Sequence, residues 1–312
     1  MQLPKRVHIM EVGPRDGFQA EHDWIPTETK IEIVNALSRT GIPEIQATSF
    51  VHPRAVPQLA DAEAVMSKIE RVPGVKYQVL VPNMKGLQRA IALRPDGLHL
   101  MMSVTESHNR SNANRSIDDS FREFEQMVPV ALDAGIEVEA GMACVFGCPF
   151  EGDVPIARLE RIMTRYREMG IVRMSLGDTI GVANPRQTYD TCAYLLDRFP
   201  DVTFTLHLHN TRDMALANVV AAMQAGVTRF DGSVGGLGGC PYAPGATGNV
   251  ATEDLVNMLT EMGIETGIDL DALIAVAKRV QEVVPHKLDS CMVKAGKRTE
   301  LKPAPIAQEK IG

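Results

Sequence analysis

The stretch from Val234 to Asn249 places six glycines around one cysteine, Cys240. Glycine tolerates positive φ and lets the backbone approach a ligand closely, so a thiol held there could take part in chemistry. A surface loop with an incidental cysteine also fits, since turns use glycine routinely. The stretch follows an expected strand, 229–233, and precedes an expected helix that begins near Thr252. This position between a strand and a helix favours a functional loop of an α/β barrel.

Two histidines, His207 and His209, lie two residues apart at the end of another expected strand. Side chains at i and i+2 of a strand point the same way, so both imidazoles could bind one ion. Two purely structural histidines are the alternative. Asp16 and Asn249 could add a carboxylate and an amide oxygen and leave open positions on an octahedral ion. Such a mixed set suits Mg²⁺, Mn²⁺ or Fe²⁺, and zinc is compatible with the ligand types.

Further polar residues follow the ends of expected strands. Arg15 would place a fixed cation beside Asp16, suited to a developing oxyanion, although a surface Arg–Asp pair would contribute little. Asp178 could act on a substrate or cap the turn that follows it. Gln46 and Ser49 come at the end of the second expected strand. We also expect a loop over 107–116, whose arginines and amides could clamp a phosphorylated ligand or simply be solvated.

Eight apolar, strand-like runs alternate with eight helical runs along the chain. The expected strands are 7–12, 44–48, 77–81, 97–102, 137–143, 172–176, 203–208 and 229–233, and the expected helices are 27–40, 59–69, 85–93, 118–134, 155–169, 185–199, 215–225 and one from about 252. This count predicts a single α/β domain, a (β/α)₈ TIM barrel over about 5–265, with an open doubly wound sheet as the competing fold. A C-terminal extension, 266–312, would carry one helix, 270–284, and a polar tail. In a barrel, the candidate residues would share one rim.

Composition narrows the class of protein. The chain has 312 residues, of which 45% are hydrophobic, and a net charge of −7. It can therefore bury a large core, and it offers no basic field for nucleic acid. Five cysteines at uneven spacing suit reduced thiols, and no apolar run reaches the ~18 residues of a membrane span. We expect a cytoplasmic protein with a small-molecule substrate and without nucleic-acid or membrane partners. A homodimer or larger homo-oligomer is left open.

Several motifs carry a resemblance to the hydroxymethylglutaryl-CoA lyase family, within the superfamily of metal-dependent lyase and acyl-synthase barrels. The most specific is Gly-Gly-Leu-Gly-Gly-Cys-Pro-Tyr-Ala at 235–243. The others are Glu-Val-Gly-Pro-Arg-Asp-Gly at 11–17, Thr-Ser-Phe at 48–50, Val-Pro-Gln at 56–58, Gly-Cys-Pro at 147–149, Ser-Leu-Gly-Asp-Thr-Ile-Gly at 175–181 and Ala-Thr-Glu-Asp-Leu-Val at 251–256. Together they cover nearly the whole chain.

The resemblance implies a reaction and a set of roles. The family splits a 3-hydroxy-3-methylglutaryl thioester into acetyl-CoA and acetoacetate with a divalent ion, usually Mg²⁺ or Mn²⁺. The implied ligands are Asp16, His207, His209 and Asn249. Arg15 would lie near the thioester oxygen, Asp178 would lie at the substrate hydroxyl, and Cys240 would act in acid–base chemistry. Asn112 and Asn114 would lie near CoA. Either His207 or Asp178 could accept the hydroxyl proton.

The sequence departs from the family pattern at two places. Gln46 stands where the lyases have glutamate, and Asn210-Thr-Arg-Asp-Met replaces Asp-Thr-Tyr-Gly-Gln, which puts Arg212 near the site. A change of one charge beside a metal alters metal affinity or substrate choice. Three alternatives therefore stay open: a lyase for a related 3-hydroxyacyl-CoA, an acyl synthase that condenses acetyl-CoA with a 2-oxo acid, and a non-catalytic barrel that binds CoA thioesters.

Overall fold

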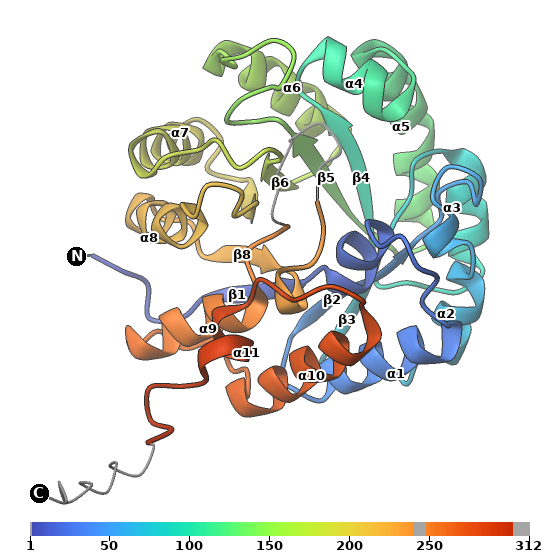
Figure 1. Cartoon of the computed structure of the whole chain (residues 1–312). Coiled ribbons are helices and arrows are strands. Elements are labelled where there is room, and N and C mark those ends of the chain that lie inside the picture. Colours follow the sequence, from blue (N-terminus) through green and yellow to red (C-terminus); the bar gives the residue numbers. More distant parts are fainter. Residues whose placement is uncertain (1, 240–247, 302–312) are drawn as a thin grey trace, which may run out of the picture.

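Eight parallel strands close into a barrel in the computed structural model of the chain, which describes residues 2–239 and 248–301 (Figure 1). The strands are β1 (His8–Glu11), β2 (Glu44–Ser49), β3 (Lys76–Leu80), β4 (Gly97–Ser103), β5 (Glu137–Ala143), β6 (Arg173–Asp178), β7 (Thr203–Leu208) and β8 (Arg229–Gly232). Each strand pairs with its neighbour in the sequence, and β8 pairs with β1 over His8 to Glu11. The predicted TIM barrel is confirmed, and the open doubly wound sheet is excluded.

Helices surround the barrel and bury their apolar sides against it (Figure 1). The helices are α1 (Thr27–Ser38), α2 (Ala62–Lys68), α3 (Met84–Ile91), α4 (Glu106–Ala113), α5 (Ile117–Asp133), α6 (Ile156–Glu168), α7 (Pro185–Arg198), α8 (Ala215–Ala225), α9 (Thr252–Glu261), α10 (Leu270–Val283) and α11 (Cys291–Ala295). Strand residues such as Ile45 and Val79 join helix residues such as Val34 and Phe121 in one hydrophobic cluster. Burial of these side chains supplies most of the driving force for folding.

The structure corrects three local expectations. The helix expected over 59–69 is divided into a 3₁₀ turn, Pro57–Leu59, and α2. The loop expected over 107–116 is largely helical, because α4 occupies most of it. The buried side chain of Asn109 stabilises this segment, since it accepts from the Ser103 amide and donates to the Arg115 carbonyl. The polar tail also begins with a short helix, α11.

Charged side chains close the amino-terminal mouth of the barrel, where a TIM barrel more often packs branched apolar residues. Glu44 is buried at the start of β2 and accepts hydrogen bonds from His8, Gln78, Arg173 and Arg229 at 2.6 to 2.8 Å. Burial alone would raise the pKa of Glu44, but the His8 hydrogen bond and the charges of the two arginines hold this pKa well below its usual range. Glu44 is therefore an ionised hub.

No helix in the described parts of the chain combines the length and the apolar character that a membrane crossing requires.

We predict that Glu44→Gln lowers the free energy of unfolding by about 3 to 5 kcal/mol, because it leaves the buried Arg229 charge without its carboxylate partner. Urea unfolding followed by circular dichroism measures the loss. Glu137→Gln is the matched control, since Glu137 also pairs with Arg173 but its side chain is 48% exposed. That variant should lose less than about 1 kcal/mol. Equal losses in the two variants would contradict the account of Glu44 as a buried hub.

Candidate active site

A short turn after β1 carries Arg15 and Asp16. Residues Gly13–Gly17 form one π-helical turn, and the amides of Arg15 and Asp16 both donate to the Val12 carbonyl. A Cβ atom at Gly17 would lie 2.8 Å from the Leu237 side chain. Only glycine therefore lets this turn approach the start of the glycine-rich stretch so closely.

The predicted ligand residues converge on one point at the carboxyl ends of the strands. Candidate ligand atoms of Asp16, His207 and His209 all lie within 4.8 Å of one another, and the two Nε2 atoms of the histidines are 3.1 Å apart. The Asn249 amide donates to Asp16 at 2.7 Å, while its buried Oδ1 has no hydrogen-bond partner. Two facing imidazole nitrogens, a carboxylate and an unpartnered amide oxygen fit a divalent ion.

The protonation states also suit a cation. Burial raises the pKa of Asp16, but the Arg15 charge, followed by those of His207 and His209, outweighs burial and holds this pKa well below its usual range. Burial and the nearby His207 charge lower the pKa of His209 to about 3. At neutral pH the site therefore offers an ionised carboxylate and a neutral imidazole, as metal ligation requires.

Arg15 is held by two acceptors. Its Nε donates to Gln46 Oε1, and its Nη1 donates to Asp16 Oδ1. Arg15 is only 4% exposed, so its guanidinium is fixed rather than solvated. Gln46 thus belongs to the cluster, and its own Nε2 is buried without a partner, as is the hydroxyl of Ser49 at the end of the same strand.

Asp178 caps the turn that follows β6. One carboxylate oxygen accepts from the Val182 amide at 2.9 Å, and the other accepts from the Ala183 amide at 3.0 Å. Burial raises the pKa of Asp178 despite these bonds. Arg212 joins the next loop to this turn, because its Nη1 donates to the carbonyls of Ile180 and Gly181.

Two predicted site residues, on and after α4, make no described contact with this cluster. Asn112 is exposed on α4, and Asn114 follows that helix with a left-handed φ of 53°. Cys240 lies outside the described residues.

The sequence analysis did not single out Asp231 or Glu253. Asp231 is buried on β8 and accepts from His207 Nδ1 at 2.9 Å. The sequence did contain a signal for Asp231, because it is an acidic residue inside the expected strand 229–233. That strand is next to the strand of the histidines. Glu253 is buried at the start of α9 and accepts from the Gly235 amide at 3.0 Å.

Glu11 and Glu253 hold the start of the glycine-rich stretch. Glu11 Oε1 accepts from the amides of Gly13 and Val234, and its Oε2 accepts from the Thr252 hydroxyl. Gly235 follows with a φ of 74°, a conformation that favours glycine. Burial raises the pKa of Glu11 to about 8 and that of Glu253 to about 7.

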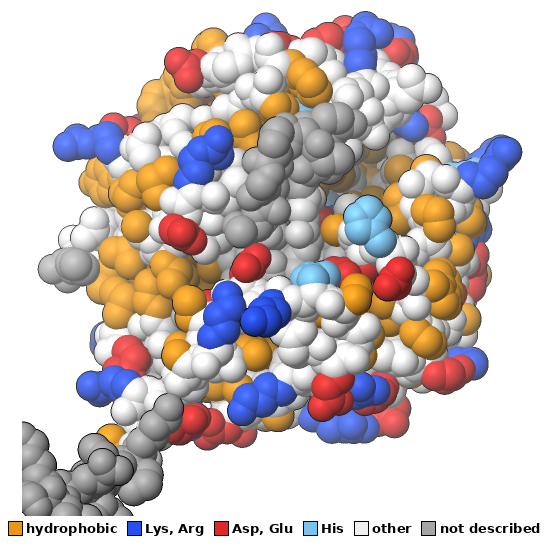
Figure 2. Space-filling model, in the orientation of Figure 1, with side chains coloured by type: hydrophobic (Ala, Val, Ile, Leu, Met, Phe, Trp, Pro, Cys, Tyr) orange, Lys and Arg blue, Asp and Glu red, His pale blue; other side chains and the backbone are white. Residues whose placement is uncertain are grey.

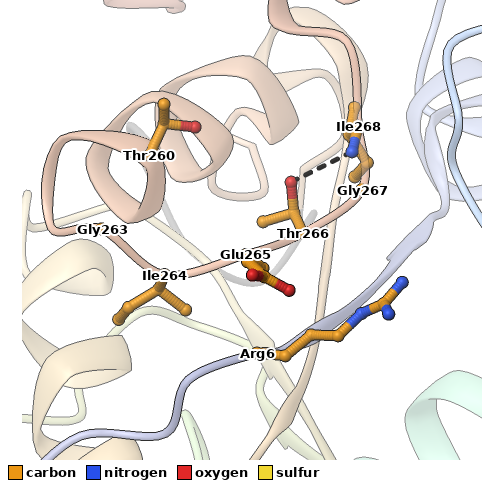
Figure 3. Close-up of a pocket in the computed structure, with 8 residues that line it drawn as sticks. All are labelled: Arg6, Thr260, Gly263, Ile264, Glu265, Thr266, Gly267 and Ile268. Atoms are coloured by element: carbon orange, nitrogen blue, oxygen red, sulfur yellow. Dashed lines mark hydrogen bonds between the residues drawn. The ribbon is translucent and has the colours of Figure 1, made fainter.

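One pocket lies at the end of the barrel opposite to the predicted site residues. Figure 2 shows a hollow near the centre of the molecule, with histidine and acidic side chains beside it. The pocket in Figure 3 is lined by Arg6, which precedes β1, and by the turn after α9. It lies at the amino ends of the strands and contains none of the predicted site residues, so we place the chemistry at the carboxyl ends.

Comparisons with known proteins show which family the chain resembles. The HMGL-like family model matches residues 6–280. A hydroxymethylglutaryl-CoA lyase of Bacillus subtilis is 49% identical over 290 residues, which cover 93% of this chain and 97% of that protein. A mitochondrial hydroxymethylglutaryl-CoA lyase of Rattus norvegicus is 44% identical over 293 residues, 94% of this chain and 90% of the relative.

A solved structure gives the same result in three dimensions. An HMG-CoA lyase from Acinetobacter baumannii, in complex with coenzyme A and 3-methylmalate, matches with a TM-score of 0.93 and 42% identity. The match covers 96% of this chain and 98% of that one.

We predict that Glu11→Gln removes a pH-dependent loss of stability. Because the pKa of Glu11 rises from 4.5 to about 8 on folding, its protonated form stabilises the fold fully below pH 4.5, and this contribution is lost as the pH rises towards 8. Glutamine keeps the Oε1 acceptor and stays neutral. Urea unfolding at pH 5 and pH 8.5 measures the free energy of unfolding of both chains. The difference between the variant and the unaltered chain should shift in favour of the variant, from pH 5 to pH 8.5, by an amount on the order of a few kcal/mol. Parallel pH profiles would contradict this.

Proposed function

Since this chain belongs to the hydroxymethylglutaryl-CoA lyase family of carbon–carbon lyases, we propose that it cleaves 3-hydroxy-3-methylglutaryl-CoA to acetyl-CoA and acetoacetate. The observation that carries the proposal is the convergence of Asp16, His207, His209 and Asn249 beside Arg15. A binding protein for CoA thioesters would not require this ligand set next to a fixed guanidinium.

The proposed cofactor is one divalent ion, Mg²⁺ or Mn²⁺, held by Asp16, His207, His209 and the free Oδ1 of Asn249. When bound, such an ion polarises substrate oxygens and lowers the pKa of a hydroxyl in contact with it. The residues of the chain supply the remaining steps. We place the CoA moiety near Asn112 and Asn114, by analogy with the family.

Arg15 is proposed to stabilise the enolate. Breaking the bond between C2 and C3 moves two electrons into the thioester, so negative charge develops on the thioester oxygen. A guanidinium already fixed by Gln46 and Asp16 meets this charge without reorganising.

Asp178 is proposed to accept the proton of the 3-hydroxyl. His207 is the weaker candidate, because its Nδ1 is committed to Asp231 and its Nε2 faces the ligand cluster. Each carboxylate oxygen of Asp178 uses one lone pair for a backbone amide and retains another. The raised pKa of Asp178 also makes it a stronger base than an ordinary carboxylate.

Cys240 is proposed to give a proton to C2 of the acetyl-CoA enolate. The hydroxyl proton then resides on Asp178, the thiol has lost one proton, and exchange with solvent restores both groups. Acetoacetate and acetyl-CoA are then released. The reaction requires no oxidant or reductant.

A lyase for a related 3-hydroxyacyl-CoA is the second candidate, and two observations favour it. Gln46 contributes an amide where the family has a carboxylate, and its Nε2 is a buried donor without an acceptor. Arg212 adds a cation to the turn that holds Asp178. Both features favour a more anionic or more oxygen-rich acyl group. If 3-hydroxy-3-methylglutaryl-CoA is bound but not cleaved, Gln46→Glu should restore turnover on it.

We expect the purified chain with Mg²⁺ or Mn²⁺ to release acetyl-CoA and acetoacetate in equal amounts from 3-hydroxy-3-methylglutaryl-CoA. EDTA and Cys240→Ala should each abolish turnover, because one removes the ion and the other removes the proton donor. Retained thioester binding without turnover in any metal would refute the proposed reaction and leave the second candidate or a binding function.

We predict that Asp178→Asn lowers kcat by about 10² to 10⁴-fold and changes KM little, because it removes the proposed base. Steady-state kinetics measure both constants. Asparagine has only one acceptor oxygen for two amides, so thermal unfolding must confirm that the variant is folded at the assay temperature. A folded variant with nearly full kcat would return the base role to His207.

A further inference from the structure

His207 and His209 differ in one respect, although both are buried on or next to the same strand. The Nδ1 of His207 is hydrogen-bonded to Asp231 at 2.9 Å, whereas the Nδ1 of His209 is buried without a partner.

The contact with Asp231 determines where the ring of His207 carries its proton. An ionised carboxylate only accepts hydrogen bonds, so the nitrogen that faces it must carry a hydrogen. In a neutral ring with hydrogen on Nδ1, the lone pair is on Nε2. That nitrogen is the one that faces His209 Nε2 at 3.1 Å.

The barrel holds this contact rigidly. The pairing of Leu206 with Phe230 between β7 and β8 places the next residues, His207 and Asp231, side by side. The side chain of Asp231 is 3% exposed, so water has little access to replace it as the acceptor. The orientation of the ring thus comes from two neighbouring strands rather than from a loop.

We propose that Asp231 is a positioning residue that fixes the tautomer and orientation of His207, so that Nε2 is presented to the divalent ion. The proposal rests on the ligand set of the proposed function. It also separates two roles for His207: with Nδ1–H bound to Asp231 and Nε2 on an ion, the ring has no lone pair left to act as a base. His207 then serves as a ligand, and the proton of the hydroxyl goes elsewhere.

The first test measures metal binding rather than activity. Free Mn²⁺ is followed by electron paramagnetic resonance during titration of the full chain, without substrate. Asp231→Asn should weaken Mn²⁺ binding about 10 to 100-fold, because the neutral amide no longer dictates which nitrogen is protonated. Ser233→Ala is the matched control, since it removes a buried polar atom from the same segment, and that hydroxyl has no partner. The control should bind Mn²⁺ within twofold of the unaltered chain.

Two outcomes are decisive and distinguishable. Equal Mn²⁺ affinity of a folded Asp231→Asn and the unaltered chain overturns the role of Asp231 and leaves the metal centre standing. Absence of Mn²⁺ binding in the unaltered chain overturns the metal centre, and this inference with it.

A second measurement tests the proposal without a substitution at Asp231. Two-bond proton–nitrogen spectra of the chain labelled with ¹⁵N-histidine report which ring nitrogen is protonated, and His207→Gln assigns the signal. A proton on Nδ1 is expected without metal, and Nε2 should shift on addition of a diamagnetic ion such as Mg²⁺. A neutral His207 ring with its proton on Nε2 would overturn the proposal even if Asp231→Asn did not fold.

Discussion

The pairing of β8 with β1 is the contact on which the site depends. Asp16 follows β1, the two histidines belong to β7 and its end, and Asn249 follows β8, so only a closed barrel makes these segments neighbours. The same closure lets Glu11 of β1 accept from the Val234 amide, which starts the glycine-rich stretch. Closure of the sheet thus positions both the proposed ligands and the start of the glycine-rich stretch.

Buried charge is distributed unevenly along the barrel axis. At the amino-terminal mouth, Glu44 is ionised because two arginines and a histidine surround it. At the opposite end, Glu11 has no cationic partner among its described hydrogen bonds, and burial favours its neutral form. The first arrangement stabilises ionised side chains, and the second adds no negative charge to that of Asp16 in a region proposed to receive an anionic substrate. Ion pairing thus stabilises the carboxylates of Glu44 at one end and Asp16 at the other, whereas burial favours the protonated form of Glu11.

The periodic features of the fold could be predicted from the sequence. Eight apolar runs between helical runs predicted the barrel, and residue types after the strand ends predicted the convergence of Asp16, His207, His209 and Asn249. The sequence also indicated two alternatives for Asp178, action on a substrate and capping of the following turn. The structure shows the capping contacts directly.

Other features depend on tertiary contacts that leave no periodic signal. The helix α4 replaces an expected loop because the side chain of Asn109 stabilises the segment through contacts on both sides. Asp231 was missed because a single acid in a short strand gains meaning only when the neighbouring strand is known. The charged mouth around Glu44 joins residues 129 and 185 positions apart, which no local pattern connects.

The distance along the chain between Asp16 and Asn249 has a kinetic consequence. These side chains are hydrogen-bonded across 233 residues, so their encounter requires closure of a very long loop. Contacts of such separation form late and slowly, after local strand–helix units. During synthesis, the set of proposed ligands is incomplete until β8 and the residues after it have left the ribosome. If the proposed site binds a divalent ion, uptake of that ion would follow the closure of the barrel.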